Sequence, residues 1–142
     1  MIDRDQLSQA IARLMPYIIR GAHLDFFVAR RISQTQFLVL VAIHAYRRCT
    51  MSTLATNLHV SLPAASGIVT RLVRSGYVVR AEDPADRRQV VVRLSSKGDA
   101  FIREFQATLS RRWAEVLGEL NARELGVMFT VISKLSQRLS RA

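Results

Sequence analysis

Hydrophobic and polar positions at the start of the chain repeat with the period of a helix. Within residues 3–31, apolar side chains recur at intervals of three and four from Leu7 to Ile18, which predicts one amphipathic helix. Pro16 lies inside this segment. Because proline removes a backbone donor and crowds the preceding turn, we expect it to kink the helix or split it near Met15.

A second and a third helix are expected next, each opened by a residue that can cap it. Ser33 and Gln36 have the spacing of a capping box, and the apolar run after them predicts a helix that ends near Arg48. Thr50 can cap a short third helix, and a tight turn is expected at residues 59–60.

The fourth helix, residues 62–76, separates two kinds of side chain most clearly. Ser61 can cap it and Gly76 can end it. At about 100° per residue, its apolar side chains gather on one side. The opposite side carries Pro63, Ala64, Ser66, Gly67, Thr70, Arg71 and Arg74. This outward face suits close approach to another surface, although a partly buried helix with a small-residue contact is the alternative.

Gly67 lies on this outward face, and the same two explanations apply to it. Glycine inside a helix costs about 0.5–1 kcal/mol relative to alanine. Its compensation is either a closer approach to a partner or a tight contact within the protein.

After this helix the period changes from helical to alternating. Residues 77–81 and 89–94 are expected to form two strands of a hairpin. The loop 82–88 between them holds a proline, which cannot donate to a strand ladder. Arg87 and Arg88 stand side by side on this loop.

Two amphipathic helices complete the chain. Ser96 with Asp99, and Asn121 with Glu124, have the spacing of capping boxes. The terminal helices carry more apolar surface than the small central module can cover, which indicates an interface; a helical pair within one chain is the alternative. The expected fold class is mainly α with a small β-hairpin wing (α+β), in the order four helices, hairpin, two helices.

Charge indicates the kind of partner. The 142 residues carry a formal net charge of +10 and form no basic tail, so folding must assemble any basic surface. All but two of the 21 basic residues are arginines, whose planar guanidinium suits phosphates and guanine edges. The surplus favours an anionic partner, with nucleic acid ahead of a membrane surface.

Several classes of protein are excluded by what the sequence lacks. A single cysteine, Cys49, forms no internal disulfide, and the charged start is no signal peptide, so a cytoplasmic location is expected. The longest apolar run, 37–43, is too short to cross a bilayer. The histidines lack metal-ligand spacing, and no catalytic arrangement can be built, so we expect no metal, no cofactor and no enzyme.

A short helix, a tight turn, a second helix and a hairpin form the layout of a winged helix-turn-helix. In such modules the second helix enters the major groove of DNA. The predicted DNA-binding residues are therefore those of the outward face above, together with Thr50 and Ser61 at the helix starts. Arg74 lies further along and is expected to meet phosphate.

The stretch from Ser33 to Gly98 resembles the MarR family of bacterial transcription regulators. The matching segments are "SQTQFLVL", "MSTLATNLHVS" and "RLVRSGYVVRAEDPADRRQVVVRLSSKG". The resemblance implies one MarR-like domain over 1–142, with a DNA-binding module at 33–98. It also implies homodimers, in which the helices of 1–31 and 99–142 interlock and each module meets half of a palindromic operator.

The resemblance also implies roles for the wing and for a ligand. A wing arginine, Arg88 or Arg87, would reach into the minor groove, and Asp86 would hold it in a hydrogen-bonded pair. Many members are repressors released by small aromatic or phenolic ligands. Side chains that could line such a pocket are Tyr17, His23, Phe26 and His44, although at helical spacing such residues are more often core.

Three alternatives to this prediction remain open. One is a non-specific, nucleoid-type DNA binder, and another is a helical module that binds a protein partner. The third concerns Cys49, because Arg47 and Arg48 before it could lower the pKa of its thiol and make it reactive. Peroxide-sensing relatives place their cysteine near the start of the first helix, where this sequence has none.

Overall fold

A computed structural model defines the backbone of residues 1–46 and 48–140, and the side chains of these residues outside 18–25. The elements are α1 (Arg4–Arg30), α2 (Gln34–Ala45), β1 (Cys49–Thr50), α3 (Met51–Asn57), α4 (Leu62–Arg74), β2 (Val78–Glu82), β3 (Val90–Leu94), α5 (Ser96–Leu117) and α6 (Ala122–Leu139). The chain is mainly helical with one small sheet, which confirms the predicted fold class. It divides into two compact units, Met1–Gln106 and Ala107–Ala142.

The predicted helix starts at Ser33 and Asn121 are confirmed as complete capping boxes. The start of α5 differs from its prediction. Ser95, not Ser96, holds the cap position, because the Ser95 hydroxyl accepts a hydrogen bond from the Gly98 N–H at 3.1 Å. The same hydroxyl donates to the carbonyl of Gly76. The start of α5 is therefore tied to the end of α4, a contact that local spacing cannot show.

Pro16 lies inside α1, which continues as one helix on both sides of it. Of the two outcomes expected, the split near Met15 does not occur. A proline removes one hydrogen bond from the ladder, and the bonds before and after it remain available to hold the helix together.

The sheet has three antiparallel strands in the order β1-β3-β2. The hairpin β2–β3 was predicted, and the register pairs Arg80 with Val92. The two-residue strand β1 was not predicted. It pairs Cys49 with Val92, and two residues are too few to show an alternating pattern.

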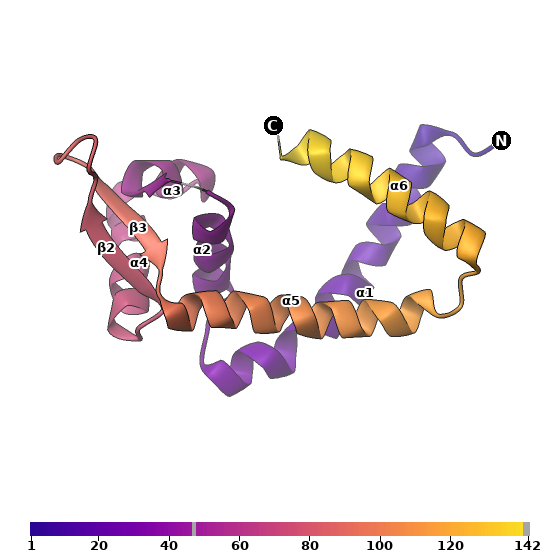
Figure 1. Cartoon of the computed structure of the whole chain (residues 1–142), viewed down its shortest axis with the longest axis horizontal. Helices are drawn as coiled ribbons and strands as arrows, with labels where there is room; N and C mark the ends of the chain where they lie inside the picture. The colour runs from indigo at the N-terminus through magenta and orange to yellow at the C-terminus, as the bar shows by residue number, and fades with distance from the viewer. Residues whose placement is uncertain (47, 141–142) are drawn as a thin grey trace. The chain divides into compact units, whose positions relative to one another are not determined.

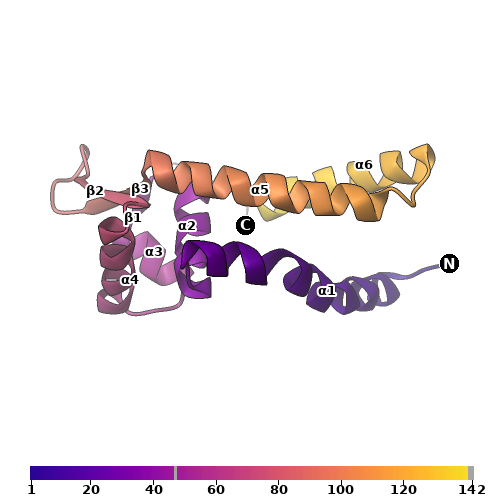
Figure 2. The same ribbon diagram turned by 90° about the horizontal axis from the view of Figure 1, so that it is seen from below.

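The core of the first unit lies among α2, α3, α4 and the sheet, which Figures 1 and 2 show grouped together. Its most deeply buried apolar side chains are Val39, Leu40, Leu54, Val69, Leu72, Val78 and Val92. Ring contacts join five phenylalanines beside them: Phe26, Phe27, Phe37, Phe101 and Phe105. In both views the loop between β2 and β3 projects beyond the sheet as a wing (Figures 1 and 2).

Two glycines fix how the hairpin follows α4. Gly76 has a φ of +81°, the left-handed conformation that ends a helix at low cost. Gly98 packs against the backbone of Tyr77, the residue after Gly76. A Cβ at Gly98 would lie 2.1 Å from the carbonyl oxygen of Tyr77. These contacts hold α4, the hairpin and the start of α5 in one arrangement.

The second unit contains the end of α5 and all of α6. None of the described residues in Ala107–Ala142 is fully buried. Exposed apolar side chains follow α6 at Leu125, Phe129, Ile132, Leu135 and Leu139. None of the helices in the described part of the chain combines the length and apolar content that a membrane span requires.

Candidate nucleic-acid interface

The turn between α3 and α4 is held by a histidine in an unusual conformation. His59 has a φ of 53°, and the Val60 N–H after it donates to the Ala55 carbonyl at 3.1 Å. This is the hydrogen-bond pattern that closes a helix with a left-handed residue. Ser61 then accepts from the Ala64 N–H at 3.2 Å and opens α4. The predicted tight turn and the predicted cap are both confirmed.

Helix α4 has the two sides that the sequence predicts. Ala65, Val69 and Leu72 have no exposed surface and pack in the core. Exposed residues on the other side are Pro63, Ala64, Arg71 and Arg74, and half-buried ones are Ser66, Gly67 and Thr70. Val73, which the periodicity placed inward, is exposed because it lies at the edge of the apolar side. The outward face of α4 therefore carries small side chains near the start of the helix and arginines near its end.

Gly67 lies on this outward face in open space. A Cβ placed there would meet no atom of the chain within 4 Å. Of the two explanations for a glycine inside the helix, a tight contact within the protein is therefore excluded. The explanation that remains for Gly67 is close approach of α4 to a partner.

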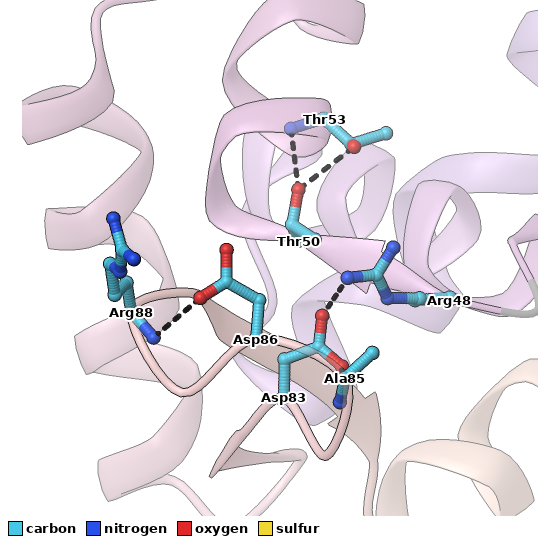
Figure 3. Close-up of polar contacts among 7 residues, drawn as sticks. All are labelled: Arg48, Thr50, Thr53, Asp83, Ala85, Asp86 and Arg88. Atoms are coloured by element: carbon cyan, nitrogen blue, oxygen red, sulfur yellow. Dashed lines mark hydrogen bonds and ion pairs between the residues drawn. The ribbon is translucent and has the colours of Figure 1, made fainter.

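Thr50 has a different role from the one expected. Its side chain is only 7% exposed, and its hydroxyl accepts from the Thr53 N–H at 3.1 Å (Figure 3). The hydroxyl also bonds the Thr53 hydroxyl at 2.9 Å. It therefore caps α3 from a largely buried position, which leaves little surface for DNA.

Asp86 holds the wing, but not in the predicted way. The expected pair with an arginine side chain is absent from the ion pairs of the described residues. Instead, Asp86 Oδ1 accepts from the backbone N–H of Arg88 at 3.1 Å (Figure 3). The Gln89 N–H also donates to the Asp86 carbonyl at 2.9 Å. Asp86 thus shapes the backbone of the loop and leaves the guanidinium of Arg88 available.

Asp83 anchors the base of the wing, a role that sequence reasoning missed. Its side chain is 3% exposed, and it forms an ion pair with Arg48, whose side chain is 53% exposed (Figure 3). Its other oxygen accepts from the Ala85 N–H at 3.0 Å. From the sequence, an aspartate in a charged loop is expected to be exposed to solvent. Its burial became evident only from its ion pair with Arg48, which is distant in the chain.

A hollow of about 260 Å³ lies where α3, α4 and the wing come together. It is lined by Thr50, Met51, Ser52, Leu62, Ser66, Arg88, Gln89 and Val90. Arg88, and not Arg87, is the wing arginine that lines it. The outward face of α4 and the wing therefore border one surface.

Arg80 also contacts this surface, although the sequence pattern did not predict a role for it. From β2, its Nη2 donates to the Ser66 carbonyl at 2.9 Å and to the Thr70 hydroxyl at 2.9 Å. It also lies 3.2 Å from the Ser66 hydroxyl. An arginine in a strand pattern carries no sign of a helix partner, so periodicity could not find this contact.

The predicted ligand-binding residues are not gathered into one pocket by the described contacts. Phe26 is 9% exposed and packs among the phenylalanines of the core. Tyr17 is exposed on α1. His44 lines a separate hollow of about 490 Å³ beside the base of the wing. The side chain of His23 lies outside the described residues.

Cys49 is not the reactive thiol that its neighbours suggested. Its side chain is buried beside the sheet, and this burial raises the pKa of the thiol. Desolvation disfavours the charged thiolate, which is the reactive form. The alternative of a thiol activated by nearby arginines is therefore not supported for Arg48; Arg47 lies outside the described residues.

These features define a winged helix-turn-helix module, and comparison with known proteins agrees. The sequence model of the MarR family matches residues 32–90. Over 111 residues the chain is 28% identical to YfiV of Bacillus subtilis, an uncharacterized HTH-type transcriptional regulator, covering 78% of this chain and 69% of YfiV. Over 90 residues it is 30% identical to the HTH-type transcriptional regulator FarR of Neisseria gonorrhoeae, covering 61% of this chain and 62% of FarR.

Solved structures extend the likeness to almost the whole chain. Rv1404 from Mycobacterium tuberculosis superposes with a TM-score of 0.79 at 20% identity, covering 96% of this chain and 94% of that one. A cysteine-to-serine variant of MarR from Escherichia coli gives 0.69 at 26% identity, covering 95% and 97%. The chain has the fold of a winged helix-turn-helix protein, and over the matched residues 32–90 it is similar to the MarR family of transcription regulators.

Proposed function

We propose that the chain is a sequence-specific repressor that binds a palindromic operator as a homodimer. The observation that carries this proposal is the shared surface of α4 and the wing. Leu62 and Ser66 on α4 and Arg88 on the wing line the same hollow. A surface of this kind lets a helix approach base edges in the major groove while the wing reaches the neighbouring groove.

Each part of this surface has a role in the proposal. Pro63, Ala64 and Gly67 keep α4 close to the DNA, and Ser66 and Thr70 meet base edges. Arg71 and Arg74, which are exposed near the end of α4, provide charge for base edges and phosphates. Arg88 enters the minor groove from a backbone that Asp86 fixes. We also propose a cytoplasmic location, where a bacterial regulator of this kind would meet DNA.

The proposed homodimer is supported by exposed apolar side chains on α6 and α1. Phe129 and Leu139 on α6 are each 75% exposed. Leu7, Ile11 and Leu14 are exposed along α1. Apolar rows of this kind mark interfaces in soluble proteins. A second copy is the occupant we propose, because two-fold symmetry matches a palindromic operator.

We propose release from DNA by a small aromatic or phenolic ligand, and the hollow beside the wing is its candidate site. Ile43, His44, Tyr46, Pro84 and Val91 are among its lining residues. The mixture of apolar walls and a few polar groups is typical of ligand sites. A panel of hydroxybenzoates, screened for release of labelled operator, tests this part. His44→Ala is expected to weaken the response while operator binding stays intact.

Selection from a random pool of duplex DNA tests the central proposal. We expect the full chain to enrich one palindromic sequence, and to bind it at least about 10³-fold more tightly than shuffled DNA. Binding should also weaken steeply with salt, because cationic side chains release counterions from phosphates. Enrichment of no sequence, with similar affinity for all duplexes, would instead support a nucleoid-type binder. Absence of DNA binding would favour a protein-interaction module.

A further inference from the structure

Arg80 joins the hairpin to the outward face of α4. Side chains alternate along a strand, so Arg80 shares a face of β2 with Val78, which is buried in the core. From there its Nη2 meets three oxygens of α4, at 2.9 Å, 3.2 Å and 2.9 Å. Two of these oxygens are the hydroxyls of Ser66 and Thr70, which the proposed function assigns to base recognition.

We propose that Arg80 is a positioning residue that holds the hydroxyl oxygens of Ser66 and Thr70 in fixed orientations toward DNA. The inference rests on the proposed function, since it concerns the same reading face. Arg80 itself need not touch a base. Its effect is to keep the two hydroxyl oxygens in place when α4 lies in the groove.

The hydrogen bonds of Ser66 and Thr70 show what each hydroxyl can still offer to a base. A hydroxyl has one proton to donate and two lone pairs. Thr70 donates its proton to the Ser66 carbonyl at 2.8 Å and accepts from Arg80, which leaves it one lone pair. Thr70 can therefore only accept from a base. The Ser66 hydroxyl accepts from Arg80 in the described contacts, so its own proton and one lone pair remain available.

Hydroxyls held in fixed orientations give a sequence preference that freely rotating hydroxyls lack. An unrestrained serine or threonine can face either a donor or an acceptor, so it discriminates little between bases. With Arg80 in place, Thr70 suits an amino group of adenine or cytosine, and Ser66 offers its proton or its remaining lone pair from a fixed position. Lysine cannot replace this arrangement, because it lacks the planar fork of the guanidinium.

The test compares two duplexes: the sequence that the wild-type protein enriches from a random pool, and a shuffled sequence of the same composition. The variants are Arg80→Met and Arg80→Lys. The matched control is Arg93→Met, which removes the same charge from β3. Arg93 pairs with Val79, so it lies on the opposite face of the sheet from Arg80.

We expect Arg80→Met to lower the ratio of affinities for the selected and the shuffled duplex by about tenfold. Affinity for the shuffled duplex, and the slope of binding against salt, should change no more than in Arg93→Met. Arg80→Lys should keep the charge without restoring the preference. Thermal unfolding of each variant establishes that the module is folded.

A background without the two hydroxyls separates positioning from direct contact. In Ser66→Ala/Thr70→Val, the effect of Arg80→Met on sequence preference should vanish. An undiminished effect in that background would overturn the proposal, as would an equal loss for both duplexes with a smaller salt slope. If Arg80→Met does not fold, Ser66→Ala/Thr70→Val alone must still lose the preference, or the proposal fails. Failure of the wild-type protein to enrich any sequence is a separate result, which rejects the proposed function itself.

Discussion

At the scale of single residues, Gly67 offers the sharpest separation of folding from binding. Since a Cβ at this position meets no atom of the chain, Gly67→Ala should raise the free energy of unfolding by about 0.5–1 kcal/mol through helix propensity. The same methyl group should weaken binding to the selected operator, because it stands where α4 approaches DNA. Urea unfolding and a gel-shift titration measure the two effects. A variant that is more stable and binds equally well would show that Gly67 does not face the groove.

Arg88 and Arg87 differ in what surrounds them, although both are exposed and adjacent. Arg88 lines the hollow beside α4, and Asp86 holds its backbone. We expect Arg88→Ala to weaken operator binding by about 1–3 kcal/mol and Arg87→Ala to have the smaller effect. Fluorescence anisotropy with both variants measures this difference, and unchanged melting temperatures serve as the control. The reverse order would assign the minor-groove contact to Arg87.

At the scale of elements, the sequence predicted most of what local chemistry controls. Capping boxes located the starts of α2 and α6, and the amphipathic pattern located the outward face of α4. It could not predict β1 or the partners of Arg80 and Asp83. These features depend on residues that are distant in the chain, and their side chains look like ordinary solvated charges until the fold brings them together.

The Arg48–Asp83 ion pair is an element-scale contact that can be tested. Asp83 is almost wholly buried while Arg48 is half exposed, so Asp83→Ala should cost more than Arg48→Ala. We expect a loss of about 1–3 kcal/mol in the free energy of unfolding for Asp83→Ala, because the Ala85 N–H and the Arg48 guanidinium both lose their acceptor. Asp86→Ala is the matched control within the same loop, and it should affect DNA binding more than stability. Equal stability of Asp83→Ala and the wild type would remove the anchoring role.

At the scale of the whole molecule, the second unit, Ala107–Ala142, carries a row of exposed apolar side chains on α6. A helix with an exposed apolar row gains little from folding unless another surface covers that row. The row on α6 is long, and no described residue of this unit is fully buried. In the proposed homodimer the second copy covers this row, so dimerisation is expected to stabilise this unit as well as to match a palindrome.

Phe129→Glu tests this dependence directly. We expect the wild-type chain to sediment at twice its mass of 16.0 kDa. A charge in the apolar row should shift it toward the monomer, because a carboxylate cannot be buried unpaired. Val127→Glu is the matched control: it makes the same kind of change two residues away, about 160° around the helix. Affinity for a full palindrome should fall in Phe129→Glu far more than affinity for a single half-site. A monomeric wild type, or two variants that both remain dimeric, would place the interface elsewhere and leave the apolar row of α6 without its proposed partner.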